Sequence, residues 1–202
     1  MISKLSQDQR VHYSRNGFVF PLKAITVEHA NRCNDYLQLY AAEELTQLTY
    51  PWQYKSYLLF TWVYDLVTHP RILDAVESVL GPDLRVLSAD IWAKPPSKTR
   101  YISWHQDASF WPLSPSRTVT AWLAIDDADT GNACMRFAAT SHHDGHLTYQ
   151  KSAEDEHNVL NQTVEEVSRY GPPVDVVLKS GEISLHSDLL LHSSELNRSN
   201  RR

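Results

Sequence analysis

The 202-residue sequence predicts an α+β protein in which helices come first and a β-sandwich or barrel core follows. Before Gly81, apolar residues recur at helical spacing. After Gly81–Pro82, short runs rich in β-branched and aromatic residues alternate with loops, which is typical of strands. The length suits one domain over residues 1–202, with 1–81 as mainly helical support and 82–202 as the β core.

Turn and capping residues divide the N-terminal part into elements. Thr26 is a suitable N-cap for a long helix, Pro70 favours a helix start, and Gly81 favours the end of the last apolar stripe. We therefore expect a surface helix, a short strand, a long helix, a helical block and a final amphipathic helix, at residues 5–16, 17–20, 26 to about 47, from 51, and 69–81.

The C-terminal part contains six runs with strand composition, at residues 84–93, 101–107, 117–125, 173–179, 182–186 and 189–193. Lys179-Ser180-Gly181 predicts a turn between two of them. Residues 142–172, with an acidic run at 154–156, predict a polar surface excursion or mobile lid between strands.

Charge and composition exclude several classes of protein. Lys and Arg number 19 against 24 Asp and Glu, a net charge of −5, so the broad basic surface of a nucleic-acid binder is missing. Cys33 and Cys134 cannot build a disulfide framework. No run approaches the roughly 20 apolar residues that span a bilayer, and the N-terminus lacks a signal-peptide core. We expect a cytoplasmic protein without nucleic-acid or membrane partners.

The segment S-W-H-Q-D-A-S-F-W at residues 103–111 points to metal chemistry. Residues two apart on a strand share a face, so His105 and Asp107 would project side by side and could bind one ion. His192 lies at the end of a later apolar run, L-L-L-H-S. Two histidines and one carboxylate form the facial triad of non-haem iron(II) oxygenases. A zinc site stays an alternative, although zinc usually takes four ligands.

Four blocks of sequence together resemble the phytanoyl-CoA dioxygenase family of iron(II)/2-oxoglutarate oxygenases. They read W-H-Q-D-A-S-F-W, R-T-V-T-A-W-L-A-I-D-D, G-N-A-C-M-R-F-A-A-T-S-H and G-E-I-S-L-H-S-D-L-L-L-H-S-S-E-L-N-R-S-N-R-R. The resemblance implies a double-stranded β-helix, or jelly roll, with Fe(II) held by His105, Asp107 and His192. It also implies 2-oxoglutarate as cosubstrate, O2 as oxidant, and release of succinate and CO2.

The same resemblance suggests further residues of the site. Trp122 would line the cosubstrate pocket, and Ser194 would hydrogen-bond the far carboxylate of 2-oxoglutarate. Thr120 shares a strand face with Trp122 and is another candidate for this pocket. Gln106 and Lys94 could face the pocket or solvent, and exposure to solvent is the expectation for both.

An arginine should pair with the far carboxylate of 2-oxoglutarate, since its planar guanidinium matches carboxylate geometry. In the family it stands eleven residues after the distal histidine, which here is position 203. Arg201 and Arg202 lie next to that position and are the candidates in this chain. We expect the natural protein to continue beyond Arg202 with the arginine and a closing strand.

Other polar clusters are assigned structural roles. His186 and Asp188 form a second His-x-Asp pair, for which turn formation is expected and metal binding is the alternative. His142, His143 and His146 are expected in a solvent-exposed loop.

We therefore predict an enzyme that hydroxylates a small, fairly apolar organic substrate near Phe110 and Trp111. The carboxylate of Asp107 favours a hydroxylase over a halogenase, because related halogenases lack it to admit a halide. Two alternatives stay open: a zinc-dependent cupin-like enzyme and a ligand-binding relative without activity.

Overall fold

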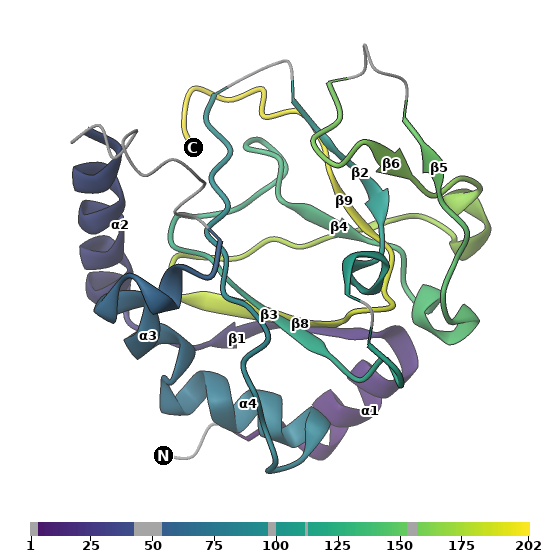
Figure 1. The fold of residues 1–202 in the computed structure, drawn as a ribbon, viewed down its shortest axis with the longest axis horizontal. Coiled ribbons are helices and arrows are strands. Elements are labelled where there is room, and N and C mark those ends of the chain that lie inside the picture. Colours follow the sequence, from purple (N-terminus) through teal and green to yellow (C-terminus); the bar gives the residue numbers. More distant parts are fainter. Residues whose placement is uncertain (1–3, 43–53, 97–99, 112, 153–156) are drawn as a thin grey trace.

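The computed structural model describes residues 4–42, 54–96, 100–111, 113–152 and 157–202 (Figure 1). The described residues contain four α-helices, all before residue 81, together with antiparallel sheets, so the predicted α+β class is confirmed. The helices are α1 Gln7–Asn16, α2 Val27–Ala42, α3 Thr61–Val67 and α4 Pro70–Leu80. A 3-10 turn, Ser56–Leu58, precedes α3. The predicted continuation of the second helix to Gln47 lies outside the described residues.

Local sequence accounts for the helix boundaries. Ser6 and Gln9 form a capping box at the start of α1, and Gly17 ends that helix with a left-handed φ of 85°. The Thr26 hydroxyl accepts a hydrogen bond from the backbone N–H of His29, as expected of an N-cap. The strand predicted at 17–20 is also present.

Two antiparallel sheets face each other (Figure 1). The first has the order β1-β8-β3, and the second has the order β2-β9-β4-β7. Their strands are β1 Phe18–Lys23, β8 Glu182–Ser187, β3 Val119–Leu123, β2 Ile102–His105, β9 His192–Ser194, β4 Met135–Phe137 and β7 Val174–Asp175. A hairpin of β5 Gln150–Lys151 and β6 Gln162–Thr163 lies beside β2.

Successive side chains of β8 point alternately to the two faces of its sheet, and each face has its own apolar cluster. Ile183 and Leu185 pack with the helices, which cover the outer face of the β1-β8-β3 sheet (Figure 1). Ser184 and His186 therefore point to the opposite face, between the two sheets. Phe18 and Phe137 are part of the apolar cluster on this inner side.

The turn predicted at 179–181 is confirmed between the β7 segment and β8. Gly181 has a φ of +88°, and a Cβ there would lie 2.5 Å from the carbonyl oxygen of Ile25. That carbonyl is close because the N–H groups of Ala24 and Ile25 both donate to the Gly181 oxygen. Only glycine permits this approach, which joins the end of β1 to the start of β8.

Two strands expected from the sequence differ in the structure. Residues 84–93 form no strand. The Ala89 carbonyl instead accepts hydrogen bonds from the backbone N–H and the hydroxyl of Ser56. This segment therefore contacts the 3-10 turn before α3 and is not part of a sheet. The run at 189–193 begins as a turn, because the N–H of Leu190 donates to the Ser187 oxygen, and β9 starts only at His192. His192 therefore begins a strand rather than ending one.

The predicted surface excursion or mobile lid at 142–172 is anchored to a sheet at a few buried residues. Its acidic run at 154–156 falls outside the described residues, and most of the remaining residues are exposed or partly exposed. Val164 is buried, and its N–H donates to the carbonyl of Trp104 on β2. The buried Asn158 side chain bonds both the backbone and hydroxyl of Ser103. These contacts attach the segment to the strand that carries His105.

In the described ranges, no helix combines the length and apolar character required to cross a membrane.

Candidate metal centre

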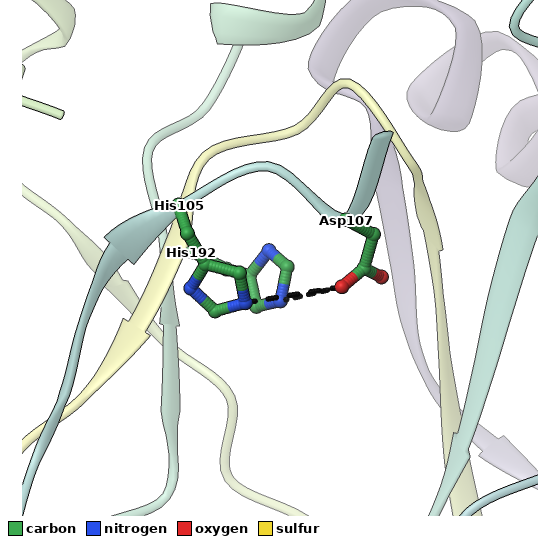
Figure 2. Close-up of side chains that lie close together, drawn as sticks. All are labelled: His105, Asp107 and His192. Carbon is green, nitrogen blue, oxygen red and sulfur yellow. Dashed lines mark ion pairs between the residues drawn. The ribbon is translucent and has the colours of Figure 1, made fainter. Parts of the chain in front are cut away.

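His105, Asp107 and His192 come together between the two sheets (Figure 2). One ligand atom from each lies within 4.8 Å of the others. The Nε2 atoms of His105 and His192 lie 3.8 and 3.5 Å from Oδ1 of Asp107, and the ring centroids are 4.0 Å apart. Both histidines are buried. This compact set of two nitrogens and one oxygen suits a single divalent ion.

Three neighbouring elements position these side chains. His105 is the last residue of β2 and pairs in register with His192, the first residue of β9. Asp107 opens a 3-10 turn, Asp107–Phe110, so the prediction that it shares a strand with His105 is wrong. Gln106 between them keeps extended backbone angles, φ −112° and ψ 133°, and the two side chains therefore still project to one side.

Backbone carbonyls orient both imidazole rings. The Nδ1 of His105 lies 2.9 Å from the Ser103 oxygen, and the Nδ1 of His192 lies 3.0 Å from the Leu190 oxygen. A carbonyl can only accept, so each Nδ1 carries the proton and each Nε2 offers its lone pair to the centre of the site. This is the arrangement that a metal-binding histidine requires.

Electrostatics favour the ligand protonation states. Burial lowers the pKa of both His105 and His192 by disfavouring the charged imidazolium, against the opposite effect of Asp107. For Asp107, burial alone raises the pKa, but the three histidine rings, with His192 first, outweigh it and bring the pKa below its ordinary value. At neutral pH the site therefore holds neutral imidazoles and a carboxylate, which fits a metal ion.

The remaining carboxylate oxygen of Asp107 has its own partners. The hydroxyl of Thr120 on β3 donates to Oδ2 at 2.7 Å. Thr120 thus contacts Asp107 of the candidate site, and its predicted place in the cosubstrate pocket stays a prediction. Trp122, two residues further along β3, is partly buried against the inner apolar cluster.

The sequence analysis misplaced His186. It lies within β8 rather than in the predicted turn, and its Nε2 is 3.5 Å from Oδ2 of Asp107. Its ring centroid is 4.8 Å from that of His192. Strand alternation contained the signal, because Ile183 and Leu185 face the helices and so place His186 on the inner face. Asp188 does lie in the turn, where its carboxylate accepts from Ser116 at 2.5 Å.

Gln106 is fully buried, so its predicted exposure to solvent is wrong. Its amide nitrogen donates to the carbonyls of Gly145 and Leu189 at 2.8 and 2.6 Å, and its oxygen accepts from the N–H of Leu147 at 2.8 Å. The residue between two ligands of the site thereby connects to the turn that precedes His192. Three backbone groups in two other segments depend on this one side chain.

Gln106→Leu should lower the free energy of unfolding by about 3 kcal/mol or more, because each unpaired buried group costs about 1–3 kcal/mol. Chemical denaturation monitored by tryptophan fluorescence measures this. As a control, Gln150→Leu changes an exposed glutamine with a single bond to Glu165, and should shift stability by less than about 0.5 kcal/mol. Equal stability of the two variants would show that the Gln106 bonds contribute little.

Lys94 is half-buried rather than solvent-exposed, a second error about polar residues near the site. Its Nζ donates to the Ser194 hydroxyl at 2.5 Å and to the Glu195 carbonyl at 2.6 Å. Ser194 is buried and in turn donates to the carbonyl of Ala133 at 2.7 Å. Burial lowers the pKa of Lys94 to about 8, against the raising effect of Glu195.

The other candidate residues lie apart from the triad. Arg201 pairs with Asp129, and Arg202 pairs with Asp126, both in the loop after β3. That loop is at the opposite end of β3 from Thr120.

The loop histidines predicted near residue 142 pack on α1. The Nε2 atoms of His142 and His143 approach the carbonyls of Ser14 and Arg15 at 3.2 and 3.0 Å, and their ring centroids are 3.9 Å apart. His143 and His146 are exposed, as predicted, whereas His142 is partly buried.

Comparison with known proteins shows to which family the chain belongs. Residues 59–202 match the family model described as phytanoyl-CoA dioxygenase. Peroxisomal phytanoyl-CoA dioxygenase of Bos taurus is 27% identical over 143 residues, covering 68% of this chain and 42% of the relative. The Rattus norvegicus protein is 30% identical over 139 residues, covering 64% and 40%. The chain thus spans about two fifths of the length of these relatives.

Solved structures agree on the fold. The non-heme monooxygenase ThoJ, in its apo form, is 30% identical with a TM-score of 0.80, covering 96% of this chain and 73% of that protein. The carbocyclase SnoK, described as non-heme and alpha-ketoglutarate-dependent, shares the fold at 21% identity and a TM-score of 0.72, covering 97% and 80%. The predicted jelly roll is therefore confirmed. Because the family model matches well over half of its residues, the chain belongs to the phytanoyl-CoA dioxygenase family.

Proposed function

We propose that the protein is a non-haem Fe(II)- and 2-oxoglutarate-dependent dioxygenase that hydroxylates a small, fairly apolar organic molecule. The observation that carries this proposal is the buried group of His105, Asp107 and His192, with the nitrogens and the carboxylate oxygen converging on one point. Bound iron and 2-oxoglutarate would supply the O2-dependent oxidation, with release of succinate and CO2. Membership of the family and similarity to ThoJ, a non-heme monooxygenase, support the same reaction class.

The protein's own residues bind and orient. Three donors from one side of an octahedral ion leave the three opposite positions free, as an oxygenase requires. Asp107 would supply the carboxylate that related halogenases lack, which supports hydroxylation. The Phe110 side chain is 46% exposed and lies edge-on to His105 at 6.1 Å between ring centroids, so it offers an apolar surface beside the site.

For the far carboxylate of 2-oxoglutarate, Lys94 and Ser194 form the better-placed pair. Ser194 is two residues after His192 on β9, so its side chain shares a face with the ligand at a spacing of about 7 Å. That spacing suits the two ends of a five-carbon dicarboxylate. Lys94 adds a cation in contact with the Ser194 hydroxyl. Trp122, Arg201 and Arg202 stay predicted contacts, and the two arginines are engaged with Asp126 and Asp129.

Lys94→Ala should raise the Kd for 2-oxoglutarate about tenfold or more, because a hydrogen bond to a charged group contributes about 1.5–3 kcal/mol. Since the pKa of Lys94 is about 8, the ammonium loses its proton as the pH rises, and the wild-type Kd should increase between pH 7 and pH 9. Isothermal titration of the metal-loaded protein measures both effects.

Two further variants sharpen this prediction. Lys94→Arg should remove the pH dependence in this range, because a guanidinium stays charged. Lys151→Ala, at an exposed lysine on β5, should leave the Kd unchanged. A wild-type Kd that is constant from pH 7 to pH 9 would contradict a role for the Lys94 charge.

The proposed function is tested by anaerobic titration of the Fe(II)-loaded protein with 2-oxoglutarate, recorded by visible absorption. A chelated keto acid gives a weak charge-transfer band, and we expect a band that saturates. Succinate does not give such a band and serves as the control. Absence of the band with tight Zn(II) binding would favour the zinc-dependent alternative, and absence with no metal binding would favour an inactive ligand-binding relative.

The cytoplasmic location and the lack of nucleic-acid partners stay predictions.

A further inference from the structure

We propose that His186 is a positioning residue which, with Thr120, makes Asp107 bind the metal through one oxygen only. This inference rests on the proposed oxygenase function and deepens it. It concerns a residue outside the group of three that could hold the ion.

The two carboxylate oxygens of Asp107 face different surroundings. Oδ1 lies toward the metal-binding nitrogens, 3.8 Å from Nε2 of His105 and 3.5 Å from Nε2 of His192. Oδ2 lies toward β3 and β8, 2.7 Å from the Thr120 hydroxyl and 3.5 Å from Nε2 of His186. Thr120 and His186 are directly opposite each other in the β3–β8 register. Together they form a surface against which Oδ2 rests.

Burial of the His186 side chain lowers the stability of the folded protein. His186 is 1% exposed, and its ring lies 5.0 Å from that of Phe137 and 4.8 Å from that of His192. Neither ring nitrogen has a hydrogen-bond partner in the ranges that the structure describes. Unpaired buried nitrogens lower stability, and an apolar side chain would pack in this cluster without that cost. The side chain is therefore better explained by the contact with Asp107 than by packing.

The contact has a consequence for coordination. A carboxylate that bound through both oxygens would, with two imidazoles, fill four of the six positions of an octahedral ion. Two positions would then remain, and a chelating keto acid would occupy both. Binding through Oδ1 alone leaves a third position for O2. His186 and Thr120 would thus keep the site competent for a reaction with both cosubstrates.

The test uses Co(II) as a spectroscopic probe and compares four variants with the wild type. His186→Leu removes the ring nitrogens, His186→Gln keeps a polar side-chain nitrogen, and Thr120→Val removes the hydroxyl that bonds Oδ2. Ser184→Ala is the matched control, because this serine is buried on the same face of β8 and its hydroxyl also lacks a partner in the described chain. Thermal unfolding establishes that each variant is folded.

With Co(II) alone, we expect His186→Leu and Thr120→Val to bind the ion but to change its visible spectrum, which reports coordination number. The affinity of the Co(II)-loaded protein for 2-oxoglutarate should fall about tenfold or more in both, as is typical for partners of metal ligands. His186→Gln and Ser184→Ala should retain the wild-type spectrum and affinity.

Two results would overturn the inference. One is a wild-type spectrum and 2-oxoglutarate affinity in folded His186→Leu. The other is a defect in His186→Gln as large as that in His186→Leu, which would assign the histidine a packing role. If His186→Leu does not fold, Thr120→Val and His186→Gln decide the question. Failure of the proposed function is distinct: wild-type protein would then not bind 2-oxoglutarate, while the Co(II) spectra would still report the role of His186.

Discussion

His192→Ala should lose Fe(II) binding and reduce 2-oxoglutarate turnover to the level of metal-free protein. The substitution leaves His105 and Asp107, two donors in place of three, on one side of the ion. The Leu190 carbonyl orients the buried imidazole of His192, and the substitution removes the Nε2 lone pair that this orientation directs at the site. His105→Ala should behave in the same way, because its ring is oriented by Ser103. Anaerobic metal titration and succinate formation measure the two losses.

Stability provides the check that these losses are local. Each alanine variant leaves one backbone carbonyl without its imidazole partner, which should cost about 1–3 kcal/mol. Chemical denaturation of the metal-free variants measures this cost. His146→Ala, at an exposed loop histidine, should bind Fe(II) and form succinate as the wild type does. Unchanged Fe(II) affinity in either His105→Ala or His192→Ala would reject that residue as a ligand.

Asp107→Gly should abolish hydroxylation while keeping part of the metal affinity. The change removes Oδ1, which lies 3.5 and 3.8 Å from the two imidazole nitrogens, and it removes the negative charge that balances the ion. A vacant coordination position then becomes available to a halide. We expect chloride to shift the absorption band of the complex with Fe(II) and 2-oxoglutarate in the variant and to leave the wild-type band unchanged.

An asparagine variant distinguishes the effect of the negative charge of Asp107 from the effect of its oxygen as a metal ligand. Asp107→Asn keeps one oxygen at a similar position but is neutral, so its Fe(II) affinity should fall between those of the wild type and Asp107→Gly. Product analysis by mass spectrometry, with and without chloride, completes the test. A chloride-dependent product from the wild-type protein would contradict the assignment as a hydroxylase.

The candidate metal ligands could be predicted from the sequence because they occur in a short motif with defined chemistry. His105 and Asp107 are two residues apart, and His192 follows an apolar run within a block that resembles a known family. The helix boundaries were predictable for a related reason: Thr26, Pro70 and Gly81 act on backbone groups only a few residues away.

The errors concern residues whose surroundings come from distant segments. Gln106 and Lys94 are polar and were expected in solvent, yet their partners are 39–101 residues away in sequence. Residues 84–93 have strand composition but lack a neighbouring strand in the described chain, and composition alone carries no information about pairing. His186 was assigned to the turn, although the turn begins only after it. The start of the turn is set by the hydrogen bond from the Leu190 N–H to the Ser187 oxygen, which the sequence does not reveal.

By itself, the sequence determined the α+β class, the order of the helices, the family resemblance and the three residues of the candidate metal site. These properties follow from local periodicity, capping and motif spacing, which act over a few residues. Only the tertiary structure decided which polar side chains are buried, and that Thr120 and His186 face the second oxygen of Asp107. Strands β3 and β8 bring these residues opposite each other from positions 66 residues apart, because register between distant strands is set by packing of the whole sheet.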